Sequence, residues 1–255
     1  MSRPTISLVL IAKNEAHNVP VLFQSIEGCF DHIVFVDTGS SDETVNKASE
    51  WANKIGTPIS IHHFEWVKDF SKARNFSLDQ VKTDYAMWMD LDDSLGNKEQ
   101  FKLWRDTAME FADYWVAKYH YALDPQGKPI VQFIRERVFK MSTNPRFKYF
   151  IHEGVTPSPG VRASIITTWW IDHRRTQAEM QQDRGRNLDI LESHKSELDG
   201  RLWFYYGKEL YENGKIEDAL KALLEAGSRM DIEPHDRILT MQYAVYCCMN
   251  LAEKM

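Results

Sequence analysis

Short apolar runs alternate with amphipathic stretches over the first part of this 255-residue chain. A continuous apolar run is typical of a strand that is covered on both faces of its sheet. Such runs predict strands at residues 6–12, 33–37, 58–63 and 85–89, and helical patterns fall between them, the last over residues 70–81. Strands that alternate with helices at this spacing indicate parallel, right-handed crossover units. The sequence therefore predicts an α/β domain with a ligand site at the carboxyl ends of its strands.

The pattern changes after residue 90 and again near residue 175. Further strand-like runs, the first two separated by a turn-rich segment, lie at residues 115–121, 130–135 and 165–171. Beyond them the strand pattern ends, and a helical period with high charge takes over. We therefore expect two domains, residues 1–175 with a sheet and residues 176–255 with helices alone.

The C-terminal part carries one repeat signal. Five residues have the spacing of a tetratricopeptide unit: Trp203, Gly207, Ala219, Leu223 and Ala226. The small residues among them would let two antiparallel helices approach closely, and residues 235–251 would supply the first helix of another unit. Half a repeat leaves an apolar face uncovered, which suggests a capping helix, a contact between copies of the chain or a chain cut short. The alternative is a helical packing element without a partner of its own.

Composition narrows the range of functions. Hydrophobic residues make up 43% of the chain and charged residues 27%, as in ordinary soluble proteins, and the net charge of −6 offers nucleic acid no global attraction. The three cysteines form neither a metal-ligand spacing nor a disulfide framework, and the lack of disulfides indicates a reducing compartment. No apolar run approaches the ~20 residues that a membrane span needs, and no signal peptide precedes the first strand. These features predict a cytoplasmic protein.

Clustered carboxylates follow the fourth predicted strand. Asp90, Asp92 and Asp93 end an apolar run, and anions so close together repel one another and are costly to desolvate. A divalent cation is a natural partner, because hard cations take carboxylate oxygens and often share them with a phosphate. Residues two apart point the same way in an extended chain, so Asp90 and Asp92 would converge on one ion. The alternative is a turn followed by a helix cap, which Asp-Asp-Ser would also suit.

Polar segments on one predicted sheet edge resemble a known family. They are Ala12-Lys-Asn-Glu15, Asp37-Thr-Gly-Ser-Ser-Asp42, Phe70-Ser-Lys-Ala-Arg-Asn75 and the Asp90 cluster. Together these segments resemble the nucleotide-sugar half of the family 2 glycosyltransferases, which have the GT-A fold, a mixed sheet flanked by helices. The resemblance is close to about residue 95 and looser through residue 173. The helical tail looks like that of tetratricopeptide-bearing members of the family.

The resemblance implies roles for individual residues. Asp37 would hydrogen-bond the base or ribose, although Thr38 stands where many relatives have a second Asp. Arg74 would meet the diphosphate or the base. Asp92 of the Asp-X-Asp motif would bind the metal directly, with Asp90 at the ribose or at a metal-bound water. Four more residues are expected near the donor: Asn14, Glu15, Asp93 and His152.

The implied reaction needs a metal ion and a base. Mn2+ or Mg2+ would neutralise the charge that develops on the β-phosphate of the leaving nucleoside diphosphate. Glu153 is the candidate general base, and His173 is a candidate third metal ligand from a late loop. Structural alternatives exist for each: a turn for Asp37, an exposed helix face for Arg74, a salt bridge to Arg135 or Arg137 for Glu153, and a place in the core for His173.

The residues and the resemblance together predict a metal-dependent, inverting glycosyltransferase. Its donor would be a nucleoside-diphosphate sugar, most commonly a UDP-sugar in this family, and its acceptor a hydroxyl on a glycan, a protein or a modified DNA base. The helical tail would bind the acceptor or form a homo-oligomer. A nucleotidyltransferase is a second candidate, although the loop at Ala12 lacks the Gly-rich phosphate motif. A non-catalytic tetratricopeptide adaptor is the third, although the retained Asp90, Asp92 and Arg74 argue against degeneracy.

Overall fold

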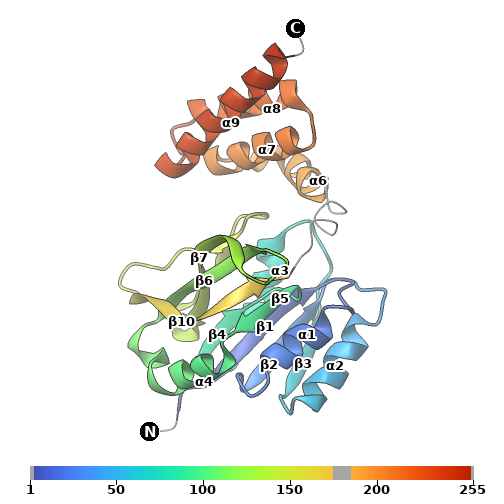
Figure 1. Ribbon diagram of the computed structural model, residues 1–255, viewed down its shortest axis with the longest axis vertical. Helices are drawn as coiled ribbons and strands as arrows, with labels where there is room; N and C mark the ends of the chain where they lie inside the picture. Colours follow the sequence, from blue (N-terminus) through green and yellow to red (C-terminus); the bar gives the residue numbers. More distant parts are fainter. Residues whose placement is uncertain (1–2, 175–184, 254–255) are drawn as a thin grey trace. The chain divides into compact units, whose positions relative to one another are not determined.

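The computed structural model describes residues 3–174 and 185–253, and the chain divides into two compact units, residues 1–175 and 176–255 (Figure 1). An eight-stranded mixed sheet forms the N-terminal unit, in the order β3-β2-β1-β4-β7-β6-β10-β5. Helices flank this sheet, so the predicted fold class is confirmed.

The first half of the sheet is parallel. Its strands are β1 (Ile6–Ala12), β2 (His32–Asp37), β3 (Ile59–His63) and β4 (Tyr85–Trp88). The connecting helices are α1 (Val19–Ser25), α2 (Thr44–Lys54) and α3 (Phe70–Asp79). These elements lie where the apolar runs predicted them. The Asp69 carboxylate fixes the start of α3, because it accepts a hydrogen bond from the amide of Lys72 at 3.0 Å.

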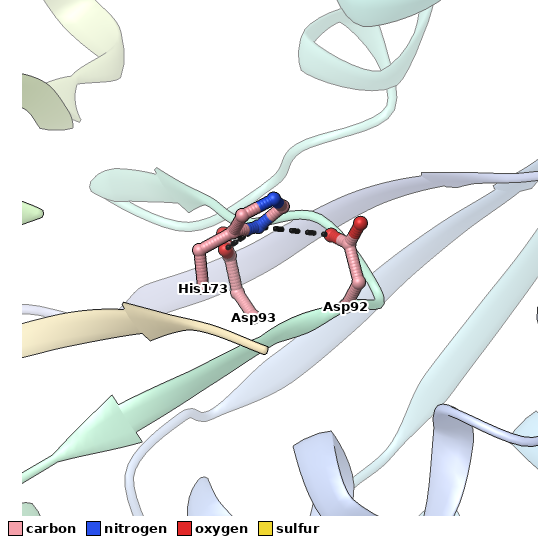
Figure 2. Close-up of side chains that lie close together, drawn as sticks. All are labelled: Asp92, Asp93 and His173. Atoms are coloured by element: carbon pink, nitrogen blue, oxygen red, sulfur yellow. Dashed lines mark hydrogen bonds and ion pairs between the residues drawn. The ribbon is translucent and has the colours of Figure 1, made fainter. Parts of the chain in front are cut away.

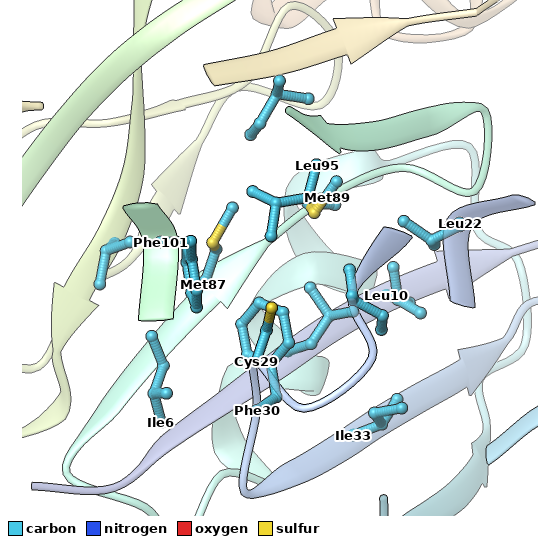
Figure 3. Packing of buried hydrophobic residues seen from close by; sticks show 14 of the residues in the cluster. Ile6, Leu10, Leu22, Cys29, Phe30, Ile33, Met87, Met89, Leu95 and Phe101 are labelled. Carbon is cyan, nitrogen blue, oxygen red and sulfur yellow. The ribbon is translucent and has the colours of Figure 1, made fainter. Parts of the chain in front are cut away.

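Two apolar layers hold this half together. One layer lies between the sheet and α1, α2 and α4 (Lys98–Thr107), and it includes Leu10, Leu22 and Phe101 (Figure 3). The other lies on the face of α3 and includes Val9. Burying each such side chain contributes roughly 1.5–3 kcal/mol, which is why the continuous apolar runs become two-sided strands.

The second half of the sheet is antiparallel at both of its ends. The strands β6 (Tyr114–Leu123) and β7 (Pro129–Lys140) form the predicted hairpin, and β7 pairs antiparallel with β4. Strand β10 (Ala163–His173) runs parallel to β6, and β5 (Asp93–Gly96) pairs antiparallel with β10. A separate two-stranded sheet is formed by β8 (Phe147–Lys148) and β9 (Gly154–Val155). Short 3-10 turns lie at Met109–Phe111 and Met141–Thr143.

The chain around the aspartate cluster differs from both sequence interpretations. Strand β4 ends at Trp88, a turn follows, and Asp93 begins β5 rather than a helix. The alternation argument for Asp90 and Asp92 was therefore wrong, because it applies only to extended chain. The alternative interpretation, a turn followed by a helix cap at Asp-Asp-Ser, was also wrong, because these residues lead into a strand. Its backbone pairing sets Asp93 directly opposite His173.

The described residues of the C-terminal unit are helical, as predicted. They form α6 (Arg186–Ser193), α7 (Gly200–Glu212), α8 (Ile216–Ser228) and α9 (Pro234–Ala252), with a 3-10 turn at Lys195–Glu197. The tetratricopeptide assignment itself stays a prediction. Within the described ranges, no helix is both long and apolar enough to cross a membrane.

Close contact between α7 and α8 depends on Gly207. A Cβ atom at this position would lie 2.6 Å from Cγ and 2.8 Å from Cδ2 of Leu223, a side chain that is itself fully buried. Real carbon atoms do not approach so closely, so only glycine permits this packing. Gly227 in α8 differs, since its nearest neighbour would be the Thr240 methyl at 3.9 Å.

These two glycines give a matched test of the packing. Gly207→Ala is expected to destabilise the chain by about 1–3 kcal/mol, because Leu223 and the helix must shift to admit the methyl group. Gly227→Ala is expected to stabilise it by about 0.5–1 kcal/mol, because alanine is the better helix former and its methyl fits. Urea denaturation followed by far-UV circular dichroism measures both. Equal effects of the two substitutions would contradict the role of Gly207.

Candidate functional site

The loops after β1 and β2 are tied together at the carboxyl edge of the sheet. Asn14 Oδ1 accepts a hydrogen bond from the Ser41 amide at 2.8 Å, and the Asn14 amide donates to Ser40 Oγ at 3.0 Å. Asn14 has a φ of 56°, a left-handed conformation that Asn tolerates well. The Glu15 amide donates to Thr44 Oγ1 at 2.7 Å. In this structure both predicted donor-binding residues shape the loop pair.

Asp37 is buried at the end of β2 and folds its own loop. Its Oδ1 accepts from the Ser40 amide at 3.0 Å, and its Oδ2 accepts from the Gly39 amide at 3.3 Å. His63, at the end of β3, brings Nδ1 to within 3.3 Å of the same Oδ2 and is mostly exposed. Asp37 and His63 lie opposite each other where β2 pairs with β3, so their contact follows from the pairing of these two strands. Sequence reasoning gave His63 no role.

Arg74 links two of the predicted site carboxylates. It is only 6% exposed, and it donates from Nη2 to Asp90 Oδ1 at 2.8 Å and from Nε to Glu153 Oε1 at 2.5 Å. The exposed-helix alternative for Arg74 was therefore wrong. Burial would raise the pKa of Asp90, but Arg74 overrides it and lowers that pKa to about 2.

Glu153 does form a salt bridge, but its partner is Arg74 and not Arg135 or Arg137. The side chain of Arg135 instead donates from Nη2 to the Glu153 carbonyl oxygen at 3.2 Å. His152, the preceding residue, has a φ of 51° and is half-buried. The loop thus presents the Glu153 carboxylate inward, toward Arg74.

Three guanidinium groups surround the buried ring of Trp88. The Cζ atoms of Arg74, Arg135 and Arg137 lie 4.5, 4.7 and 3.9 Å from its centroid. Arg137 is fully buried and also lies 4.5 Å from the ring of Tyr119. Burial lowers the pKa of Arg137, and its Nε and Nη2 find no hydrogen-bond partner in the part of the chain that the structure describes. Such a cation is tolerated because aromatic faces and nearby carboxylates offset its desolvation.

Asp92, Asp93 and His173 gather donor atoms suited to a metal ion. One oxygen from each carboxylate and one ring nitrogen all lie within 4.8 Å of one another (Figure 2). His173 Nδ1 is 3.4 Å from Asp93 Oδ1 and 3.6 Å from Asp92 Oδ1. Asp90 lies outside this group, because Arg74 holds one of its oxygens.

The three residues fit a divalent cation on physical grounds. Among residues 3–174 and 185–253, Asp92 Oδ1 is buried and has no hydrogen-bond partner, which is costly for a carboxylate oxygen unless a ligand meets it. Two carboxylate oxygens suit Mg2+ or Mn2+, and an imidazole nitrogen suits Mn2+ in particular. Asp93 is completely buried and already accepts from the Tyr119 hydroxyl at 3.1 Å and from the Asp90 amide at 3.1 Å. These bonds fix its carboxylate in place.

The pKa values of Asp92 and His173 are both raised. Burial raises the pKa of Asp92 to about 7, and repulsion from Asp90 and Asp93 adds to the rise. Burial opposes ionisation of His173, but its bond to Asp93 and the charge of Asp92 raise its pKa overall. Both shifts favour the protonated forms of the two side chains when no cation is bound. Tyr119 and Arg137, which complete the cluster, were missed because single aromatic and basic residues in a strand carry no periodic signal.

The raised pKa of Asp92 predicts an unusual pH dependence of stability. An aspartate in the unfolded chain titrates near pH 3.9, so between about pH 4 and 7 the folded chain binds more protons than the unfolded chain. In EDTA, stability should therefore fall as the pH rises from 5 to 8. Asp92→Asn should reduce this fall by at least ~1 kcal/mol, measured by urea denaturation at each pH. An unchanged slope in Asp92→Asn would contradict the assignment.

Comparisons with known proteins identify the family of the N-terminal unit. The model of the family described as glycosyl transferase family 2 matches residues 7–166. The SPbeta prophage-derived glycosyltransferase SunS of Bacillus subtilis is 22% identical over 235 residues, which cover 86% of this chain and 52% of that protein. The chain thus spans about half the length of the curated relatives that it matches.

Two solved structures share the fold. The crystal structure of S. aureus TarS 1-349 in complex with UDP-GlcNAc is 14% identical with a TM-score of 0.55, covering 95% of this chain and 89% of that one. Mannosyltransferase PcManGT from Pyrobaculum calidifontis, in complex with GDP-Man and Mn2+, is 15% identical with a TM-score of 0.54, covering 100% of this chain and 89% of that one. At such identities the likeness shows the fold alone.

Proposed function

Because the chain belongs to glycosyl transferase family 2, we propose that it transfers a sugar from a nucleoside-diphosphate sugar to an acceptor hydroxyl. The observation that carries this proposal is the group Asp92, Asp93 and His173 beside Arg74 at the carboxyl end of β4. Ligands of α/β sheets bind at such strand ends. UDP-GlcNAc in the TarS complex favours a UDP-sugar as the donor.

A cation held by Asp92, Asp93 and His173 would act as a Lewis acid at the diphosphate of the donor. The unpartnered oxygen of Asp92 supports Mn2+ or Mg2+ at this position, and the Mn2+ of the PcManGT complex favours the former. Neighbouring side chains hold the carboxylates of the proposed site in place. Arg74 keeps Asp90 ionised and directed toward the site, where its other oxygen would accept a bond from the ribose or from a metal-bound water.

The loop pair after β1 and β2 would bind the nucleoside. Within the described residues, Asp37 Oδ1 accepts a bond from the Ser40 amide alone, so it would accept a second one from the base or ribose. The exposed imidazole of His63 lies beside it and would meet the same part of the donor. Asn14 and Glu15 would then act mainly by holding the loop that carries these contacts.

Glu153 is proposed as the general base of an inverting transfer. Its Oε1 is bound by Arg74, and its Oε2 makes no hydrogen bond within residues 3–174 and 185–253. The free oxygen would take the proton of the acceptor hydroxyl as that hydroxyl attacks the anomeric carbon. The bond from this carbon to the β-phosphate oxygen breaks in the same step, and the nucleoside diphosphate leaves with the bonding electrons. His152, next to it, would contact the donor sugar.

The two units would divide donor and acceptor functions. We infer that residues 176–255 form a tetratricopeptide-like domain, supported by the close packing of Gly207 on Leu223. Along α9, residues Ile238, Met241, Val245 and Met249 are exposed at helical spacing. Such a stripe would bind an acceptor, which the family leaves open as a glycan, a protein or a modified nucleobase, or it would join two copies of the chain.

Binding of the donor gives the direct test of this function. UDP with Mn2+ is expected to raise the melting temperature of the protein, and a panel of nucleoside-diphosphate sugars should identify one that is hydrolysed. Asp92→Ala should abolish the metal-dependent part of both signals, because the cation loses its least satisfied ligand. Asp79→Ala, an exposed carboxylate on α3, is the control and should behave like the wild type. Pyrophosphate release from a nucleoside triphosphate would favour a nucleotidyltransferase, and no response to any nucleotide would favour an adaptor.

The base has its own test. Glu153→Gln keeps the size of the side chain and its contact with Arg74 but cannot take a proton. We expect the rate of transfer to fall about 10²–10⁴-fold while the affinity for UDP and Mn2+ is retained, measured by isothermal titration calorimetry. Full transfer activity in Glu153→Gln would assign the proton to another group.

A further inference from the structure

Two tyrosines from one strand enclose the imidazole of His173. Tyr119 and Tyr121 lie two residues apart on β6, and although the pairing of β6 with β7 shifts register between His120 and Ala122, both rings contact the ring of His173. The parallel register of β6 and β10 pairs His120 with Asp172, which makes Tyr121 and His173 the next residues along their strands. The ring of Tyr121 is stacked on that of His173, with centroids 5.5 Å apart and planes 8° from parallel. Tyr119 approaches it at 5.7 Å and 47°.

Polar contacts alone hold the imidazole weakly. Nδ1 of His173 lies 3.4 and 3.6 Å from Asp93 and Asp92, beyond the 2.7–3.2 Å that is usual for an N–H···O hydrogen bond. The ring of His173 lies within the usual distance range for aromatic pairs from both tyrosine rings, whereas these polar contacts are longer than usual. The orientation of the ring, and with it the direction of its nitrogen, therefore depends on the aromatic side chains of β6.

Tyr121 is an unusual residue to find in this position. It is 41% exposed, and its hydroxyl makes no hydrogen bond within the described part of the chain, whereas the Tyr119 hydroxyl bonds Asp93. Within the described residues, the ring of Tyr121 contacts three other aromatic rings: those of His173, Tyr119 and Phe133. Packing in the core does not account for so exposed a ring, but support of His173 does.

We propose that Tyr121 is a positioning residue that orients His173 toward the cation held with Asp92 and Asp93. Ligand histidines in metal sites are usually oriented by a second group, whose loss typically weakens metal binding about 10–100-fold. Here an aromatic face performs this task in place of a hydrogen-bond acceptor. The inference rests on the proposed metal site, and it adds Tyr121 to the residues of the β6–β7 hairpin that contact that site.

Titration with Mn2+ alone tests this role, with electron paramagnetic resonance measuring the free ion. Tyr121→Ala should weaken Mn2+ binding about tenfold, and Tyr121→Phe should restore the wild-type affinity, because the ring and not the hydroxyl does the work. Phe133→Ala is the matched control. Phe133 is 42% exposed on the same hairpin and contacts Tyr121 but not the ring of His173, so its loss should have the smaller effect.

A second readout does not depend on the metal. In the metal-free protein, the Cε1 proton resonance of His173, assigned by its absence in His173→Gln, should be shifted by the Tyr121 ring. This shift should persist in Tyr121→Phe and disappear in Tyr121→Ala. If the wild type binds no Mn2+, the proposed metal site fails. If it binds Mn2+ and Tyr121→Ala binds equally well, or if Phe133→Ala is as damaging, the positioning role alone is overturned.

Discussion

The structure depends on balancing charge that is buried at the carboxyl end of β4. Asp90, Asp92 and Asp93 lie within four residues, and each would be costly to desolvate alone. Arg74 offsets Asp90, while Arg137 lies beneath Asp93 with its cation held between two aromatic rings. Asp92 is the member without such a partner. The carboxylates of this short segment thus contact Arg74 of α3, Arg137 of β7 and His173 of β10.

The order of the strands is what allows this balance. Strands β4 and β5 are separated by four residues of chain, yet β7, β6 and β10 lie between them in the order of the sheet. The turn between β4 and β5 therefore connects the half of the sheet that carries the loops after β1 and β2 with the half formed by the hairpin and β10. Asp93 meets His173 because β5 pairs with β10, and Tyr119 reaches both from the neighbouring strand.

Local periodicity was sufficient for the parallel half and insufficient for the site. The strands β1 to β4 follow from continuous apolar runs, and α3 follows from its spacing. Strand β5, with the sequence Asp-Ser-Leu-Gly, has no alternation long enough to recognise, so the pairing of Asp93 with His173, eighty residues apart, could not be derived. The same holds for Arg74 and Glu153, because an ion pair between distant residues leaves no trace in either local segment. Family resemblance supplied these residues as candidates but not their partners.

The ring of arginines around Trp88 has a consequence for the order of binding events. Four carboxylates, those of Asp90, Asp92, Asp93 and Glu153, lie among three arginines, Arg74, Arg135 and Arg137, so this set holds one more acid than base. Under the proposed function, a divalent cation at Asp92 and Asp93 would add two positive charges and favour the approach of a diphosphate. The arginines would thus bring the site close enough to neutrality for a single ion to decide whether the proposed donor can enter.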